Sequence, residues 1–310
     1  MIFYSVNDYF KHRYGRKIVK LSLDGGFTCP NRDGKLDTRG CLFCSDRGSG
    51  EYAGIVTDGF YMAETQPILE QMAYQKSLLS DKWRDCGYLG YFQNFSNTYA
   101  PLEKLIETYA PVYEDSSVVG LALATRPDCI TDEMYPLFKS YMARGEFWLE
   151  LGLQSIHPQS VSLIRRHYDM ALFESVYSRL KAEEIPVVLH IILGLPEETR
   201  EMMLETVKYV SSLKPFGVKF HMLNVLRGSD LEAYYAKENF KLIEVHEYID
   251  LICDALELLP ADITIHRLTG DGPRELLIAP MWIRNKRAVL NGIQREMRRR
   301  GTVQGAKSEV

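Results

Sequence analysis

The sequence of 310 residues predicts an α/β protein built as a partial, open (β/α)6 barrel of the TIM type, with a C-terminal helical extension. Short runs rich in Val, Ile, Leu and aromatic residues alternate with longer amphipathic segments, and several of these runs are apolar on both faces. This alternation implies parallel strands joined by right-handed crossovers. Six strand–helix units are too few for an eight-fold barrel, so we expect an open one. We place the core domain at 1–228 and the extension at 229–310.

Each expected strand has an ordinary length and is enriched in β-branched or aromatic residues. The six strands are expected at 17–23, 87–93, 117–124, 147–154, 186–193 and 217–224, and a weaker seventh falls at 262–268. The expected helices are 65–80, 102–110, 131–144, 158–166, 171–184, 198–213, 230–238, 244–258 and 284–300.

The composition is that of a soluble globular protein, with 46% hydrophobic and 25% charged residues. No run of 18 apolar residues occurs, so we expect neither a transmembrane helix nor a membrane partner. The N-terminal residues lack the basic-then-apolar order of a signal peptide. Three of the six cysteines are clustered, and a paired disulfide framework is not evident, which favours a reducing compartment. We therefore expect a cytoplasmic protein.

The net charge of −4 hides a strongly basic C-terminal segment. From Met281 onward the sequence holds eight Lys or Arg residues and only two acidic residues. Such asymmetry suggests an anionic partner, although a solvated terminal helix explains the charge equally well. The residues that we predict to contact nucleic acid are Arg284, Lys286, Arg287, Arg295, Arg298 and Arg299.

Three cysteines lie within the sixteen residues CPNRDGKLDTRGCLFC, namely Cys29, Cys41 and Cys44. A 4Fe–4S cluster normally takes four cysteines, so three would leave one iron open to a small ligand. A structural zinc ion would need a fourth ligand from elsewhere, such as His12. The spacing alone leaves both metals open.

Polar residues and glycines follow most of the predicted strands. Function in such folds gathers at the C-terminal ends of the strands, so these residues should converge on one site. They are QNFSNT at 93–98, TRPD at 125–128, Glu150 with Gln154, His190 before GLPEE, and His221 with Asn224. A carboxylate inside an apolar strand, such as Glu150, needs a partner or a function.

The segment LSLDGGFTCPNRDG…GCLFC resembles the radical S-adenosylmethionine (SAM) superfamily. It is most similar to the YhcC/YtqA-type bacterial proteins, relatives of the radical SAM domain in the catalytic subunit of Elongator. The wide spacing C-x11-C-x2-C is typical of this subgroup, and the resemblance continues through ELGLQSIHPQSVSLIRRHYD to WIRNKRAVLNGI. It implies a radical SAM-type barrel in which Cys29, Cys41 and Cys44 hold three irons of a 4Fe–4S cluster. SAM would bind the fourth iron and be cleaved to a 5′-deoxyadenosyl radical, so the three cysteines are the catalytic positions.

The same resemblance implies how SAM is held. The turn at 93–98 would receive its amino group, Gln154 the ribose and Arg166 the carboxylate, through the geometry that Arg–carboxylate pairs favour. Two positions depart from related sequences, because Ala124 replaces a glutamate and His190 replaces a ribose-binding aspartate. The implied SAM-binding residues are Gln93, Asn94, Ser96, Arg126, Glu150, Gln154, Arg166, His190, Ile192, Gly194 and His221.

The resemblance further implies a role in tRNA modification, with a flavodoxin- or ferredoxin-type electron donor. No acetyltransferase domain follows within these residues, so we expect action on an existing wobble-uridine modification. The expected reaction converts 5-carboxymethylaminomethyl-(2-thio)uridine to 5-aminomethyl-(2-thio)uridine. Two alternatives stay open: a radical SAM enzyme acting on a small molecule such as a porphyrin precursor, and a non-catalytic, zinc-stabilised RNA-binding module.

Overall fold

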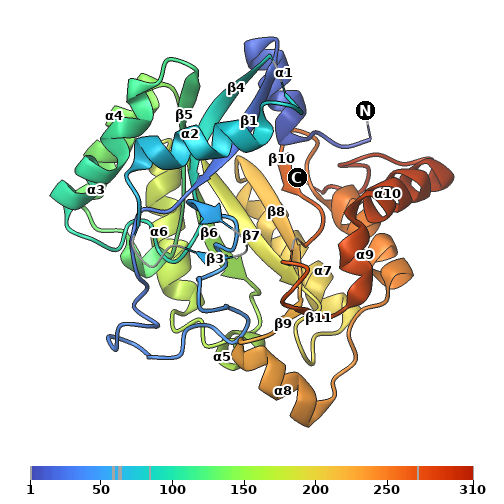
Figure 1. The fold of residues 1–310 in the computed structure, drawn as a ribbon. Coiled ribbons are helices and arrows are strands. Elements are labelled where there is room, and N and C mark those ends of the chain that lie inside the picture. The colour runs from blue at the N-terminus through green and yellow to red at the C-terminus, as the bar shows by residue number, and fades with distance from the viewer. Residues whose placement is uncertain (1, 58–59, 62–64, 84, 271, 310) are drawn as a thin grey trace.

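Seven parallel strands form one curled sheet at the centre of the molecule, with helices covering its outer face (Figure 1). The computed structural model describes the chain except residues 1, 58–59, 62–64, 84, 271 and 310. In spatial order the strands are β1 Lys17–Leu23, β4 Cys86–Phe92, β5 Val118–Thr125, β6 Glu146–Gln154, β7 Val187–Leu193, β8 Gly217–Met222 and β10 Thr264–Arg267. The predicted partial TIM-like barrel is confirmed, and the weaker strand expected at 262–268 is its seventh strand, β10.

Helices connect the strands and cover the sheet, as the amphipathic segments predicted. Side-chain caps fix several of their starts; for example, Asp169 accepts a hydrogen bond from the backbone of Leu172, and Thr199 accepts one from Met202. The helices are α1 Val6–Tyr14, α2 Ile68–Leu79, α3 Leu102–Tyr109, α4 Met134–Arg144, α5 Pro158–Leu163, α6 Met170–Ala182, α7 Arg200–Leu213, α8 Asp230–Glu238, α9 Val245–Leu258 and α10 Lys286–Arg300. Short 3-10 helices lie at η1 Ala110–Glu114, η2 Pro127–Cys129 and η3 Met281–Asn285.

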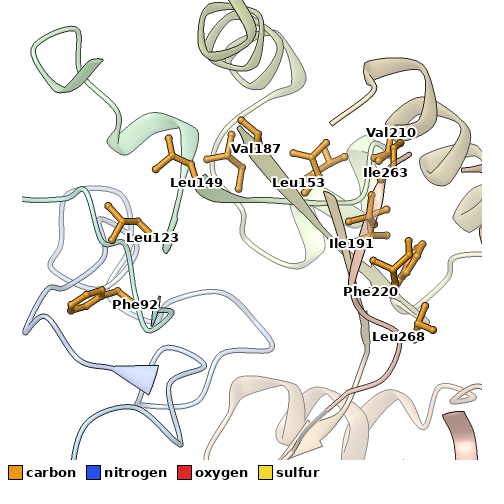
Figure 2. Close-up of a cluster of buried hydrophobic side chains, with 14 of the residues drawn as sticks. Phe92, Leu123, Leu149, Leu153, Val187, Ile191, Val210, Phe220, Ile263 and Leu268 are labelled. Atoms are coloured by element: carbon orange, nitrogen blue, oxygen red, sulfur yellow. The ribbon is translucent and has the colours of Figure 1, made fainter. Parts of the chain in front are cut away.

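The main hydrophobic core lies between the outer face of the sheet and the helices. Strand residues alternate between the two faces, so Leu149 and Leu151 of β6 point to the helices whereas Trp148 and Glu150 point to the inside of the curl. Figure 2 shows this core, with labelled side chains from β4, β5, β6, β7, β8 and α7. The inner face is therefore free to carry polar groups without weakening the core.

Helix α1 closes the N-terminal end of the barrel, and the sequence patterns did not predict it. Ser5 and Asp8 form a capping box at its start, and Gly15 ends it in a left-handed conformation. Only Phe10 is fully buried, so the helix lacks the apolar stripe that periodicity detects. Phe10 packs against Trp148, with ring centroids 6.0 Å apart, and fills the inside of the curl.

The C-terminal extension packs beside the barrel and also contributes to it. It supplies strand β10 to the sheet, while β11 Leu277–Ala279 pairs with β9 Val225–Leu226. Helix α10 lies on α9 through the buried side chains of Ile293 and Met297. A small hairpin, β2 Val56–Thr57 with β3 Phe60–Tyr61, follows the cysteine segment. Among the described residues, no helix is both long and apolar enough to cross a membrane.

Candidate active site

A cavity of about 190 Å³, which we call the main cavity, opens at the C-terminal ends of the strands. Strands β5 to β8 border one side of it, and the loop after β1 borders another. Nine of the eleven SAM-binding positions predicted from the sequence line it: Gln93, Ser96, Arg126, Glu150, Gln154, Arg166, His190, Ile192 and His221. The structure does not place Asn94 and Gly194 on its wall. Gly194 instead forms a turn with a positive φ, facing Ile243.

All three clustered cysteines lie on the wall of the main cavity. Turns hold their backbone, since Arg32 donates to the carbonyl of Cys29 and Cys44 donates to that of Cys41. The side chain of Asn31 donates to the sulfur of Cys41 at 3.4 Å and to the carbonyl of Arg165 at 2.8 Å. The bond to Arg165 anchors residues 29–50, which we call the cysteine loop, to the segment after α5.

The electrostatics of the cysteine pair favour one thiolate. The hydrogen bond from Cys44 lowers the pKa of Cys41 to about 6, while the same bond raises the pKa of Cys44. Burial raises the pKa of Cys29. Within the described ranges, no three His, Cys, Asp or Glu side chains converge as they would around a single metal ion. The remaining cysteines, Cys86, Cys129 and Cys253, lie elsewhere and are reduced.

The cysteine loop packs closely on the turn that follows β4. Glycine is required where they meet, because a Cβ on Gly50 would lie 2.2 Å from the Cβ of Asn94. The turn itself is held by Asn97, whose side-chain amide donates to the carbonyls of Phe92, Asn94 and Ala124. The cysteines and the 93–98 turn therefore form one rigid wall.

A fully buried carboxylate, Glu150, forms the inner end of the main cavity. One of its oxygens accepts hydrogen bonds from Lys20 at 2.8 Å and from the Trp148 indole at 3.1 Å. The other accepts from Tyr91 at 2.8 Å, Lys219 at 3.0 Å and His190 at 2.7 Å. Burial alone would raise the pKa of Glu150, but the two lysines hold it well below its usual range.

The sequence comparison decides the family. The family model of the Radical SAM superfamily matches residues 38–210, and the model of the Radical SAM C-terminal domain matches residues 215–299. The chain belongs to the radical SAM superfamily.

Relatives support the same assignment. YtqA of Bacillus subtilis, an uncharacterized protein, is 41% identical over 98% of this chain and 92% of its own length. A tRNA uridine(34) acetyltransferase of Methanocaldococcus infernus is 26% identical over a region that covers 52% of this chain and 30% of that protein. The solved structure of Elp3 from the same archaeon aligns with a TM-score of 0.65 at 16% identity, over 93% of this chain and 64% of that one. This last likeness shows the fold.

Radical SAM membership implies SAM and a 4Fe–4S cluster, and the main cavity fits both. Three thiols on one wall suit a cluster with one open iron. Ser96, Gln154 and His221 line the same cavity, and their buried atoms Oγ, Oε1 and Nε2 lack hydrogen-bond partners among the described residues. Buried polar atoms are normally satisfied, so these three are suited to a polar ligand. Membership favours the iron–sulfur interpretation of the cysteines over zinc.

Arg166, which was predicted to hold the SAM carboxylate, already has partners within the protein. It donates to the carbonyls of Leu153, Ser155 and Tyr168 and is almost fully buried. These bonds fix the segment after α5, which ends three residues earlier than predicted. Arg166 therefore shapes the cavity wall in this structure, and its contact with the SAM carboxylate stays a prediction.

Other predicted positions also have partners. Arg126 forms a two-pronged ion pair with Asp128, at 2.9 and 2.7 Å. His190 binds Glu150, so the inner carboxylate holds its ring in place. Lys219 of β8 is a further residue of the site, which the sequence patterns above did not predict. The sequence does contain a pattern that could have indicated it, because Lys219 and His221 are polar residues at alternate positions of an apolar strand.

The predicted nucleic-acid residues lie on η3 and α10, away from the wall of the main cavity. Arg287, Arg295 and Arg298 are exposed on α10. Arg284 donates to the carbonyl of Arg274, and Arg299 pairs with Glu296. The neighbouring Arg300 pairs with Asp250 and Asp254 of α9 and is structural. Lys286 is exposed.

Proposed function

We propose that this radical SAM enzyme acts on tRNA and converts 5-carboxymethylaminomethyl-(2-thio)uridine at the wobble position to the 5-aminomethyl form. The observation that carries the proposal is the main cavity, which joins three cysteines to a polar inner end. Similarity to a tRNA uridine(34) acetyltransferase supports the choice of a wobble uridine. Under this proposal the protein acts in the cytoplasm.

The residues present suggest how the two cofactors would be held. Cys29, Cys41 and Cys44 would hold the cluster, while Ser96 and Gln154 would bind SAM through their unpartnered oxygens. When bound and reduced, these cofactors supply the ability to abstract a hydrogen atom from an unactivated carbon. A flavodoxin- or ferredoxin-type protein would supply the electron.

The protein itself must orient the substrate and exclude water. Ile192 is 5% exposed and offers an apolar surface on the wall of the main cavity. The ion pair of Arg126 with Asp128 and the Arg166 bonds to carbonyls keep that wall fixed. Rigid walls place a substrate carbon against the reacting group reproducibly.

The exposed face of α10 would bind the tRNA backbone. Arg287, Arg295 and Arg298 lie at spacings of eight and three residues, so they share a side of the helix. Contacts of arginine with phosphates supply affinity without reading sequence. The target base would leave its stack to enter the main cavity, as enzymes that modify bases require.

Nucleoside mass spectrometry of tRNA tests this proposal. A strain that lacks the gene should accumulate the carboxymethylaminomethyl nucleoside and lose its aminomethyl derivatives. The gene should restore the profile, and a Cys41→Ala version should not. An unchanged wobble-uridine profile in the deletion strain would overturn the tRNA assignment.

A further inference from the structure

The segment between the first two clustered cysteines folds back on itself. The backbone of Gly40 donates to the carbonyl of Asn31 at 2.7 Å, which closes the segment just before Cys41. The backbone N–H of Asn31 also donates to the sulfur of Cys29. The wide spacing of these two cysteines therefore places the side chain of Asn31 against the sulfur of Cys41, at 3.4 Å.

The amide group of Asn31 is fully buried and is held in one orientation. Its nitrogen donates to the carbonyl of Arg165 at 2.8 Å and to the sulfur of Cys41. A backbone carbonyl can only accept a hydrogen bond, so the atom beside it is the amide nitrogen and not the amide oxygen. The NH2 group carries two hydrogens, one for each of these acceptors. The bond to Arg165 therefore aims the other N–H at the sulfur.

Ionisation of Cys41 would strengthen its bond from Asn31. A cysteine that holds iron is a thiolate, which accepts hydrogen bonds and has no proton to donate. The contact between the Cys41 sulfur and the carbonyl of Arg165, at 3.8 Å, needs a thiol proton and would be lost. The bond from Asn31 needs none, and it gains strength because its acceptor is charged and buried. Asn31 is thus a donor that an iron-bound Cys41 would keep.

Cys44 has a polar neighbour of the same kind. The hydroxyl of Ser49 lies 3.5 Å from its sulfur, and it would be the donor once Cys44 is a thiolate. The side chain of Gln93 donates to the carbonyl of Ser49 at 2.9 Å and so holds the backbone of that residue. Ser49 is only partly buried, so its bond to sulfur should be weaker than that of Asn31.

We propose that Asn31 is a positioning residue that raises the reduction potential of the cluster through its hydrogen bond to Cys41. This inference rests on the proposed ligation of the cluster by Cys41 and is independent of the tRNA assignment. Reduction by one electron adds negative charge to the cluster and its sulfur ligands. A hydrogen bond to sulfur therefore stabilises the reduced form more than the oxidised form. A higher potential favours electron transfer from the flavodoxin- or ferredoxin-type donor.

Redox titration of the reconstituted protein without SAM, followed by electron paramagnetic resonance (EPR), tests the proposal. Asn31→Leu keeps a similar volume and removes both N–H donors of the side chain. We expect the equilibrium constant for reduction to fall about tenfold, which lowers the midpoint potential of a one-electron couple by about 59 mV. Asn31→Gln keeps an amide donor and should retain part of the potential. Ser49→Ala should lower the potential by a smaller amount.

His167→Leu is the matched control for a loosened cysteine loop. His167 lies in the segment after α5, as Arg165 does, and its ring contacts Asp37 of the cysteine loop at 3.3 Å. That contact joins the same two segments without involving a cysteine sulfur, so His167→Leu should keep the potential of the wild type. An unchanged potential in Asn31→Leu with a full cluster, or an equal decrease in His167→Leu, would overturn the proposal.

Pulsed EPR of the reduced cluster provides a readout that loop anchoring alone would not change. Protein reconstituted in heavy water should show an exchangeable deuteron coupled to the cluster, and this signal should decrease in Asn31→Leu. Labelling the side-chain nitrogen of asparagine with 15N should add a coupling in the wild type. Absence of that nitrogen coupling in the wild type would refute the role of Asn31 even if Asn31→Leu fails to bind iron.

Failure of the proposed function gives different results. A Cys41→Ala protein that keeps its cluster at an unchanged potential would remove Cys41 from the ligands, and the role of Asn31 with it. Loss of the cluster in Cys41→Ala, together with a wild-type potential in Asn31→Leu, would support the ligation and refute the role of Asn31. An unchanged wobble-uridine profile in the deletion strain, with a lowered potential in Asn31→Leu, would overturn the tRNA assignment and support the role of Asn31.

Discussion

Replacing Glu150 with glutamine should destabilise the protein severely. The substitution keeps the shape of the side chain but removes the charge that Lys20 and Lys219 share, and Lys219 is 3% exposed. Removing one partner of a buried ion pair typically costs about 3–5 kcal/mol, because the other charge stays buried without compensation. The three neutral or weakly basic donors to this carboxylate would also lose an ionised acceptor. We therefore expect the free energy of unfolding to fall by about 3–5 kcal/mol.

Urea unfolding of the cluster-free protein, followed by circular dichroism, measures this change. Glu238→Gln is the matched control, since Glu238 pairs with the exposed Lys237 and should contribute less than about 1 kcal/mol. Adding Lys219→Met to Glu150→Gln should recover part of the loss, because it removes the stranded charge. A loss below about 1 kcal/mol for Glu150→Gln, or strict additivity in the double variant, would refute the reasoning.

Three further predictions concern the cluster, pH and tRNA. Alanine at any of the three clustered cysteines should abolish the absorbance of the reconstituted cluster and the cleavage of SAM, whereas Cys86→Ala should change neither. Burial lowers the pKa of Lys219 to about 7 from 10.5; the unfolded chain therefore binds more protons above pH 7, and stability should rise with pH relative to Lys219→Met. A constant difference in unfolding free energy between pH 7 and 9.5 would contradict this. Reversing Arg295 and Arg298 to glutamate should weaken tRNA binding and reduce the slope of log K against log salt by about two, and an unchanged slope would return α10 to a merely solvated helix.

The barrel strands could be predicted because their composition follows directly from their environment. Leu149, Leu151 and Leu153 face the helices, and residues on the inner face are also mostly enclosed, so each strand appears as an apolar run. Helix α1 escaped prediction because a single residue, Phe10, is fully buried and the rest of its surface is polar or partly exposed. Periodicity reports the amount of buried surface, and this helix buries too little of it.

The candidate site could be predicted in its location and only in part in its contacts. The polar residues at the strand ends were predicted to meet at one site because parallel strands bring their C-terminal ends together, and they line one cavity. The partners of each side chain depend on distances that a sequence does not contain. Arg166, for example, donates to backbone carbonyls that the sequence does not place near it. The hydrogen bond from Lys219 to Glu150 depends on how strongly the sheet curls, because the two residues lie on different strands. Residue type and strand position could suggest these groups, but not which of them would meet.

The contact between the two ends of the chain has a consequence for self-association. Strand β10 is an edge of the sheet, and Tyr4 and Ser5 cover it, with the backbone of Ile265 donating to the carbonyl of Tyr4. The backbone N–H of Gln304 donates to the carbonyl of Ile2, and its side-chain oxygen accepts from the backbone of Tyr4, 300 positions away. Loss of the Gln304 side chain would remove its bond to Tyr4 and loosen this cover, and the backbone groups of an uncovered edge are a template on which another strand can add. The effect should therefore appear first as oligomers at high protein concentration.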